Sequence, residues 1–201
     1  NRSNWICSGP SLRGERVIQD GVDTRGRHPW HLTSSPSHPL TSSPPHPLLA
    51  IGESGLDRLC HTPYDLQLQV FREEVALSEQ LRKPLFLHCV RAIDDALAIR
   101  KQLRALQPWI WHGYRGNARQ LRQLLSHNFY FSFATAAHTQ ALLACPARRL
   151  LLETDDDTRH PISLLYGNVS QILGMPPEDL IRQMQQNYND LFILSINRLD
   201  I

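Results

Sequence analysis

The amino-acid sequence predicts an α/β protein in which helices cover a parallel β-sheet. Short, fully apolar segments alternate along the chain with longer segments whose apolar residues recur at helical spacing. Strands that are apolar throughout indicate a sheet buried on both faces, and the alternation of strand and helix indicates parallel strands. A chain of 201 residues can bury its own core, so we expect one domain over residues 1–201.

The charge balance excludes a large, nonspecific nucleic-acid clamp. The chain has 21 basic and 19 acidic residues, for a net charge of +2, which leaves room for a small basic site. No apolar run approaches the roughly 18 residues of a membrane span, so we expect no membrane contact. No two of the four cysteines (Cys7, Cys60, Cys89 and Cys145) form a CxxC pair. This spacing argues against a zinc ribbon and a disulfide framework, and it favours the cytoplasm.

Residues 33–48 form a proline-rich tandem repeat, in which TSSPSHPL is followed directly by TSSPPHPL. Proline excludes a helix there, because it lacks a backbone N–H and restricts the residue before it. We expect an exposed, protease-sensitive loop insertion. His38 and His46 lie within it, either as solvated side chains or as a metal-binding pair.

The expected elements follow one another from residue 48 onward. Apolar strands are expected at residues 48–53, 84–88, 108–112, 129–133 and 149–155. A helix is expected at 64–82, a short one near 138–144, and a last one from Pro176 and Pro177, since proline favours a helix start. The helix after the second strand has an apolar face of Ile99, Leu103 and Leu106, and the helix after the third strand has one of Leu121, Leu124 and Leu125. The apolar face of the last helix is formed by Ile181, Met184, Tyr188 and Leu191.

Four of the strands end in a side chain that can bind a metal: Glu53, His88, His112 and Asp155. No glycine-rich phosphate-binding loop follows any strand, which weakens the alternative of an open nucleotide-binding sheet. In a barrel of parallel strands, the C-terminal strand ends converge on one mouth. We therefore expect a (β/α)8 barrel of the TIM type that brings the four side chains together.

The mixture of imidazole and carboxylate groups is typical of a divalent-metal site. A bound ion would lower the pKa of a water molecule and stabilise charge on a phosphoryl or carbonyl oxygen. Each residue alone has another interpretation, as a structural histidine or as a carboxylate that caps the next helix. Four such residues at four strand ends favour the metal site.

Six motifs occur in order along the chain: HPWH (28–31), AIGESGLD (50–57), KPLFLHCVRA (83–92), WHGYRGN (111–117), LLLETD (150–155) and NYNDLF (187–192). In these motifs the chain resembles the TatD family of metal-dependent deoxyribonucleases, which are amidohydrolase-like TIM barrels. The HGYRG form resembles a shorter branch of the family. The resemblance implies a hydrolase that uses divalent ions to cut phosphodiester bonds in DNA, and we expect Mg²⁺, Mn²⁺ or Zn²⁺ as the ion. No feature of the sequence indicates an obligate protein partner.

The resemblance also implies a role for each matching residue. Glu53 matches a shared carboxylate ligand, and His88 and His112 match two imidazole ligands. Asp155 matches a late aspartate that binds metal and accepts a proton from water. His28 matches a histidine close to the site. It either contacts the substrate or supports a metal ligand from behind, or it has a structural role.

Three other residues have two open interpretations each. Arg91 and Arg115 follow the two strand-end histidines, and either contact a substrate phosphate or carry surface charge. Asp57 either orients a ligand or caps the turn after Gly55.

The sequence departs from the family pattern in its first third. The family opens with a strand that ends in HxH, and no HxH occurs here. Residues 4–8 resemble the second family strand, so we expect a barrel that lacks its first strand, binds one ion well, and has an HxH segment encoded upstream. The repeat at 33–48 replaces an expected helix. Two rival functions stay open: an amidase or lactonase on the same barrel, and a catalytically silent barrel.

Overall fold

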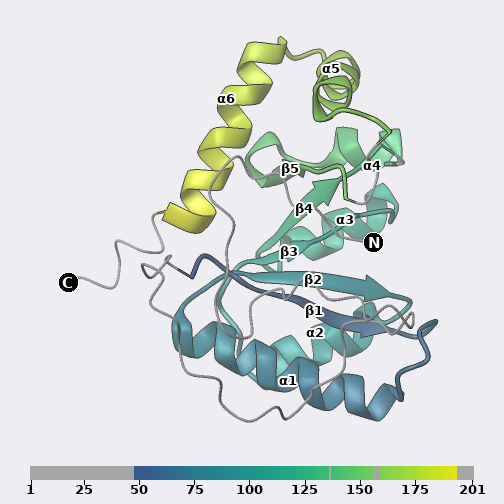
Figure 1. Ribbon diagram of the computed structural model, residues 1–201, viewed down its shortest axis with the longest axis vertical. Coiled ribbons are helices and arrows are strands. Elements are labelled where there is room, and N and C mark those ends of the chain that lie inside the picture. The colour runs from purple at the N-terminus through teal and green to yellow at the C-terminus, as the bar shows by residue number, and fades with distance from the viewer. Residues whose placement is uncertain (1–47, 136, 156–158, 194–201) are drawn as a thin grey trace.

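The computed structural model describes residues 48–135, 137–155 and 159–193 of the chain (Figure 1). Its strands are β1 (Ile51–Asp57), β2 (Leu85–Val90), β3 (Trp109–Trp111), β4 (Phe129–Phe133) and β5 (Leu150–Leu152). Its helices are α1 (Tyr64–Leu81), α2 (Ile93–Gln102), α3 (Ala118–Leu125), α4 (Thr139–Ala144), α5 (Ile162–Leu173) and α6 (Pro177–Tyr188). Two short helices, η1 (Ala147–Arg149) and η2 (Asn189–Ile193), complete the described elements.

Several expectations fall outside the described residues. These are the strand at residues 4–8, the segment around His28, and the loop at 33–48 except Leu48. The four strands expected from residue 84 onward and the helix expected at 64–82 are confirmed, with shifted ends.

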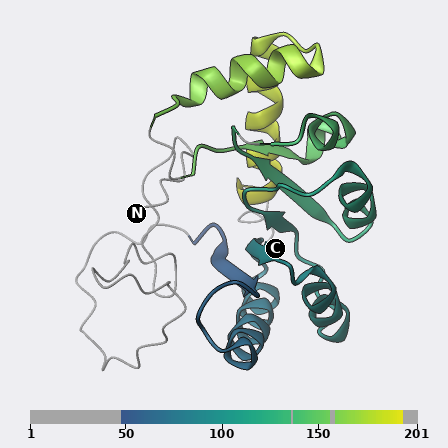
Figure 2. The same cartoon turned by 90° about the vertical axis from the view of Figure 1, so that its right-hand side faces the viewer.

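The sheet topology is that of a barrel rather than of a doubly wound sheet. The strands pair in parallel in the order β1-β2-β3-β4-β5, so each strand lies beside the next one in the sequence. Buried apolar residues from all six α-helices belong to one cluster with residues of one face of the sheet. Figure 2 shows the ribbons of the first four helices arranged around one side of the strands. A doubly wound sheet would reverse its strand order and carry helices on both faces. Within the described residues the sheet is not closed, as expected for a partial (β/α)8 barrel.

Alternate residues of each strand point to the two faces of this sheet. The outer face, under the helices, is made of large side chains such as Leu87, Trp109 and Phe131, which are fully buried. The inner face carries a second, smaller cluster, which we call the apolar layer: Phe86, Ile110, Tyr130 and Leu151. The side chains of Leu191 and Phe192 from η2 pack on this layer.

The segment formed by α6 and η2 is anchored on the sheet by a buried side-chain amide. The side chain of Asn187 on α6 is 1% exposed and donates hydrogen bonds of 2.7 Å to the carbonyl oxygens of Ala147 and Leu150. This anchor sets the start of η2, whose Phe192 ring stacks on Phe86 with 6.0 Å between ring centroids. The side chains of η2 therefore cover part of the inner face toward the N-terminal ends of the strands.

The helix expected from Pro176 is confirmed, with Pro177 as its first residue. Its predicted apolar face is only partly correct. Met184 is buried, but Ile181 is 52% exposed, and the α-helix ends at Tyr188, so Leu191 lies in η2.

The expected apolar face on the second helix is also corrected. Ile99 is buried on α2, but the helix ends at Gln102, and Leu103 and Leu106 are exposed. The chain turns away at Arg104, which has a left-handed backbone with φ of 51°.

The strand ends differ in two places that affect the site. β1 continues to Asp57, so Glu53 lies inside the strand rather than at its end. β5 ends at Leu152, so Asp155 lies on the loop three residues beyond it. No helix in the described part of the chain combines the length and apolar content needed to cross a membrane.

Candidate metal centre

A polar layer continues the inner face beyond the apolar layer. It consists of the residues two positions farther along β2, β3, β4 and β5: His88, His112, Ser132 and Glu153. Because side chains on one face of a strand recur every two residues, this layer points the same way as the apolar layer, but toward the C-terminal ends of the strands. The site therefore follows from the strand alternation that also builds the core.

Two glycines of β1 bring Glu53 against this layer. Gly52 and Gly55 have φ values of +145° and +151°, which side chains rarely tolerate. A Cβ atom on Gly55 would lie 1.8 Å from the carbonyl oxygen of His88, so only glycine permits the close approach of β1 to β2. The strand register shifts between Ile51 and Ser54, and Glu53 lies within this irregular segment.

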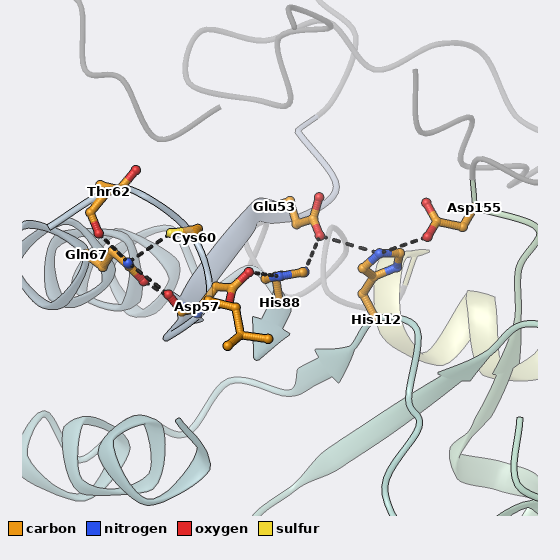
Figure 3. A network of polar contacts seen from close by, with 9 residues as sticks. Glu53, Asp57, Cys60, Thr62, Gln67, His88, His112 and Asp155 are labelled. Carbon is orange, nitrogen blue, oxygen red and sulfur yellow. Dashed lines mark hydrogen bonds and ion pairs between the residues drawn. The ribbon is translucent and has the colours of Figure 1, made fainter. Parts of the chain in front are cut away.

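Glu53, His88 and His112 converge on one point (Figure 3). The Glu53 Oε1 atom lies 3.3 Å from His88 Nδ1 and 3.5 Å from His112 Nε2. One ligand atom from each of the three residues lies within 4.8 Å of the others. Ligands bound to zinc at about 2.1 Å in a tetrahedron lie about 3.4 Å apart, so these separations fit a shared ion.

Asp155 lies beside this group, on its open side. Its Oδ2 atom is 3.6 Å from His112 Nε2, and its side chain is 34% exposed, compared with 9% for His112. The backbone of Asp155 is left-handed, with φ of 49°, at the end of the described part of the loop after β5. The four residues expected to meet are therefore brought together.

Each histidine also contacts a carboxylate behind it. His88 Nε2 lies 3.5 Å from Asp57 Oδ2, while Asp57 Oδ1 accepts a hydrogen bond of 2.7 Å from Leu59 N. Asp57 thus holds a turn, and its other oxygen faces His88, as the orienting role that the sequence left open requires. Gln67 on α1 fixes that turn, because its buried amide bonds Asp57 N, Asp57 O and Thr62 O.

The carboxylate behind His112 belongs to Glu153, which the sequence interpretation did not select. Its Oε1 atom lies 2.9 Å from His112 Nδ1, on the side of the ring opposite Glu53. Glu153 is 5% exposed and also accepts hydrogen bonds from Gly113 N at 2.6 Å and Ser132 Oγ at 2.5 Å. The alternation in LLLETD places Glu153 on the same face as Leu151 and could have identified it.

The carboxylates give both imidazoles a preference for a positive charge. Burial lowers the pKa of His112, but its contact with Glu153, together with Glu53 and Asp155, outweighs burial and raises the pKa to about 9. Burial likewise lowers the pKa of His88, and the contact with Glu53 outweighs it, for a net rise. A metal ion could supply the same positive charge at this point.

The remaining candidates are placed differently. Arg91 and Arg115 are exposed on the turns after β2 and β3, and the hydrogen bonds and ion pairs found among the described residues do not join them to the metal-binding group. His28 lies outside the described residues, as do Asp156 and Asp157 beside Asp155.

Comparison with known proteins identifies a family and relatives to which this chain is similar. Residues 18–193 match the family described as TatD related DNase. The metal-dependent hydrolase YabD of Bacillus subtilis is 34% identical, with 72% of this chain and 65% of that protein covered. The 3'-5' ssDNA/RNA exonuclease TatD of Edwardsiella piscicida is 35% identical, with 67% and 55% covered.

The fold of solved relatives agrees as well. The TatD homologue YJJV of Escherichia coli superimposes with a TM-score of 0.64 at 20% identity, over 72% of this chain and 64% of that one. The chain spans less than two thirds of the length of each of these relatives. The family match covers most of the chain, and the chain belongs to the TatD family of related DNases.

Proposed function

We propose that this chain is a metal-dependent hydrolase that cuts phosphodiester bonds in DNA. The observation that carries the proposal is the convergence of Glu53, His88 and His112 within 4.8 Å in a chain of the TatD family. Their imidazole and carboxylate donors suit Zn²⁺ or Mn²⁺, and Mg²⁺ is the third candidate. The three residues would hold one ion and leave a position open.

The chain's own groups divide the chemistry between them. A bound ion would polarise the phosphate and lower the pKa of a water molecule. Asp155 would accept the proton of that water, since its carboxylate lies beside His112 and is the most exposed of the four. Glu53, placed between the two imidazoles, would hold the ion against both.

The names of the relatives support a nucleic-acid substrate. The protein from Edwardsiella piscicida is called a 3'-5' ssDNA/RNA exonuclease, and a human relative, 34% identical over 53% of this chain, is called a 3'-5' RNA nuclease. We propose DNA as the substrate and RNA as the alternative. Arg91, Arg115 and His28 would contact its phosphates. The shorter HGYRG-type branch, the single-domain organisation and the cytoplasmic location stay predictions from the sequence.

A nuclease assay on the purified chain tests this proposal. Labelled single-stranded DNA is incubated with the chain, with EDTA, and with EDTA followed by Mn²⁺, Mg²⁺ or Zn²⁺. We expect cleavage that EDTA abolishes and one of the ions restores. Asp179→Asn serves as a control, because Asp179 is an acidic residue on α6 that pairs with Arg182.

Three results would contradict the proposal, and loss of cleavage in Asp179→Asn would mean only that the control substitution damages the chain. Cleavage that persists in EDTA would exclude the metal role. Turnover of amide or lactone substrates without DNA cleavage would favour the amidase or lactonase. No turnover and no stoichiometric metal would favour the silent barrel.

A further inference from the structure

We propose that Glu153 is the positioning residue of this metal centre, and that it acts by holding the His112 ring so that Nε2 faces the ion. The proposal rests on the function proposed above, because it assigns His112 as a ligand. It adds a residue that is not itself a ligand. Glu153, which follows β5, connects the chain after β3 with Ser132 on β4.

The contact geometry separates Glu153 from the ligands. Its Oε1 atom lies 2.9 Å from His112 Nδ1, whereas Glu53 and Asp155 face Nε2 at 3.5 and 3.6 Å. The two nitrogens are on different sides of the ring, so Glu153 does not share the ion with His112. A carboxylate on Nδ1 favours a proton there, and the lone pair of the neutral ring is then on Nε2.

Glu153 is itself held from two neighbouring strands. The N–H of Gly113, directly after His112, donates to Oε1, and the hydroxyl of Ser132 on β4 donates to Oε2. Both carboxylate oxygens are therefore occupied, and the side chain is only 5% exposed. Rotation of Glu153 would break contacts with β3 and β4 together, so the carboxylate keeps its place relative to the ring.

The backbone supports the same arrangement. His112 N donates to Leu87 O at 3.0 Å, and Glu153 N donates to Phe133 O at 3.0 Å. These bonds continue the pairing of β3 with β2 and of β5 with β4 past the strand ends. The ring and its carboxylate are thus both fixed at the main chain, which is what precise orientation of a ligand requires.

The second histidine provides an internal comparison. Asp57 lies 3.5 Å from His88 Nε2, a longer contact than that of Glu153, and one of its oxygens serves the turn at Leu59. We therefore expect Asp57 to orient His88 less firmly than Glu153 orients His112.

The test uses Glu153→Gln, which keeps the size and removes the charge, with Asp57→Asn as the matched variant and Asp179→Asn as the control. Zinc affinity is measured by competition with a chromophoric chelator, and the ring nitrogens of His112 are followed by ¹⁵N NMR. We expect Glu153→Gln to weaken zinc binding by about 10- to 100-fold and to shift the Nδ1 signal of His112. Asp57→Asn should have a smaller effect on affinity, and Asp179→Asn none.

Two outcomes would overturn the proposal. One is unchanged zinc affinity and an unchanged His112 signal in folded Glu153→Gln. The other is a loss of thermal stability alone, which is what a merely structural role predicts. If Glu153→Gln does not fold, Ser132→Ala removes one of the two donors that hold Glu153, and an unchanged Nδ1 signal there overturns the proposal as well.

Failure of the proposed function gives a different result. If the unmodified chain binds no zinc and cuts no DNA, the proposed function fails. The His112 signal of the metal-free chain then still reports whether Glu153 holds the ring, by comparison with Glu153→Gln.

Discussion

The inner face of the sheet carries two layers that differ in what they do. The apolar layer (Phe86, Ile110, Tyr130 and Leu151) is covered by the side chains of η2. The polar layer (His88, His112, Ser132 and Glu153) comes two residues later on the same strands and meets Glu53 and Asp155.

Both layers lie on the same face of the sheet, so the face alone does not decide the role of a residue. Its position along the strand decides whether it packs in the core or belongs to the metal-binding group. Toward the N-terminal ends the side chains of η2 pack on the inner face, where Ile110 is 0% exposed and gains from burial. Toward the C-terminal ends Ser132 and Glu153 are buried but hydrogen-bonded to each other, while Glu53, His88 and Asp155 are 22 to 34% exposed and can bind an ion. Changes in the polar layer and its partners should cost function, and changes in the apolar layer should cost folding.

The largest expected effect is on turnover in Asp155→Asn. The substitution keeps the shape of the side chain but removes the group that we propose accepts the proton of water, so kcat should fall by about 10²- to 10⁴-fold. The midpoint of urea unfolding should stay the same, because the side chain is on the open side of the site. Single-turnover assays and urea titrations check both parts. Near-normal kcat would refute the assigned role.

The apolar layer is tested by Ile110→Ala. Ile110 is 0% exposed and packs among Phe86, Tyr130 and the residues of η2. Removing three buried carbon atoms should lower the free energy of unfolding by about 2 to 5 kcal/mol. The matched control is Ile181→Ala on α6, where a side chain that is 52% exposed should cost less than about 0.5 kcal/mol. Zinc affinity of folded Ile110→Ala should match that of the unmodified chain; a large loss would show that the layers are not separable.

Metal should stabilise the chain through the polar layer. Zinc at 100 times its dissociation constant should add about 2.7 kcal/mol to the free energy of unfolding, provided it binds the folded state alone. EDTA should remove this gain. In Glu53→Gln, which lacks the carboxylate between the two imidazoles, the same zinc concentration should raise the free energy of unfolding by less. Thermal unfolding at fixed protein concentration measures each case, and equal zinc stabilisation of both chains would remove Glu53 from the ligand set.

The apolar strands and the strand-end histidines could be predicted from the sequence, because a fully apolar run and the polar residue that follows it are local features. Fully apolar runs marked β2, β3 and β4, and a histidine directly after an apolar run marked His88 and His112. Their convergence needed only the rule that parallel strands end on one edge.

Other features depend on contacts between distant parts of the chain. Glu153 gains its role from His112, which is 41 residues earlier, and from Ser132 on another strand. The irregular segment of β1 depends on how closely Gly55 approaches His88. Helix α5 was not predicted, because its apolar residues lie on more than one face, and Leu164 is 46% exposed. Its signals were Pro161 before the helix and the left-handed Gly174 after it.

The pH dependence of the metal-free chain should report on the polar layer. The pKa of His112 is raised to about 9, above its ordinary value near 6.5. The folded state therefore binds this proton more tightly than the unfolded state, so the stabilisation is complete below about pH 6.5 and is lost as pH rises toward 9. Between pH 7 and 8 the loss due to His112 should be at most about 1.4 kcal/mol, and His88, whose pKa is also raised, should add a loss of the same sign. Urea titrations in EDTA measure it, and Glu153→Gln should flatten the slope; a rise in stability over this range would contradict the sign.

The smallest expected effect concerns Arg115, which lies three residues after His112 of the polar layer. Its guanidinium is exposed on the turn after β3, and an exposed charge contributes about 1 kcal/mol or less to one contact. If it contacts a substrate phosphate, Arg115→Ala should raise KM for single-stranded DNA by up to about fivefold, leave kcat unchanged, and weaken the dependence of KM on salt. Arg119→Ala is the matched control, since Arg119 is an exposed arginine on the next helix, α3, and should leave KM unchanged. Equal effects of the two substitutions would mean that the surface attracts DNA by its overall charge. A fall in kcat for Arg115→Ala alone would instead extend the catalytic part of the molecule beyond the polar layer, because a residue on the loop would then stabilise the transition state and not only the bound substrate.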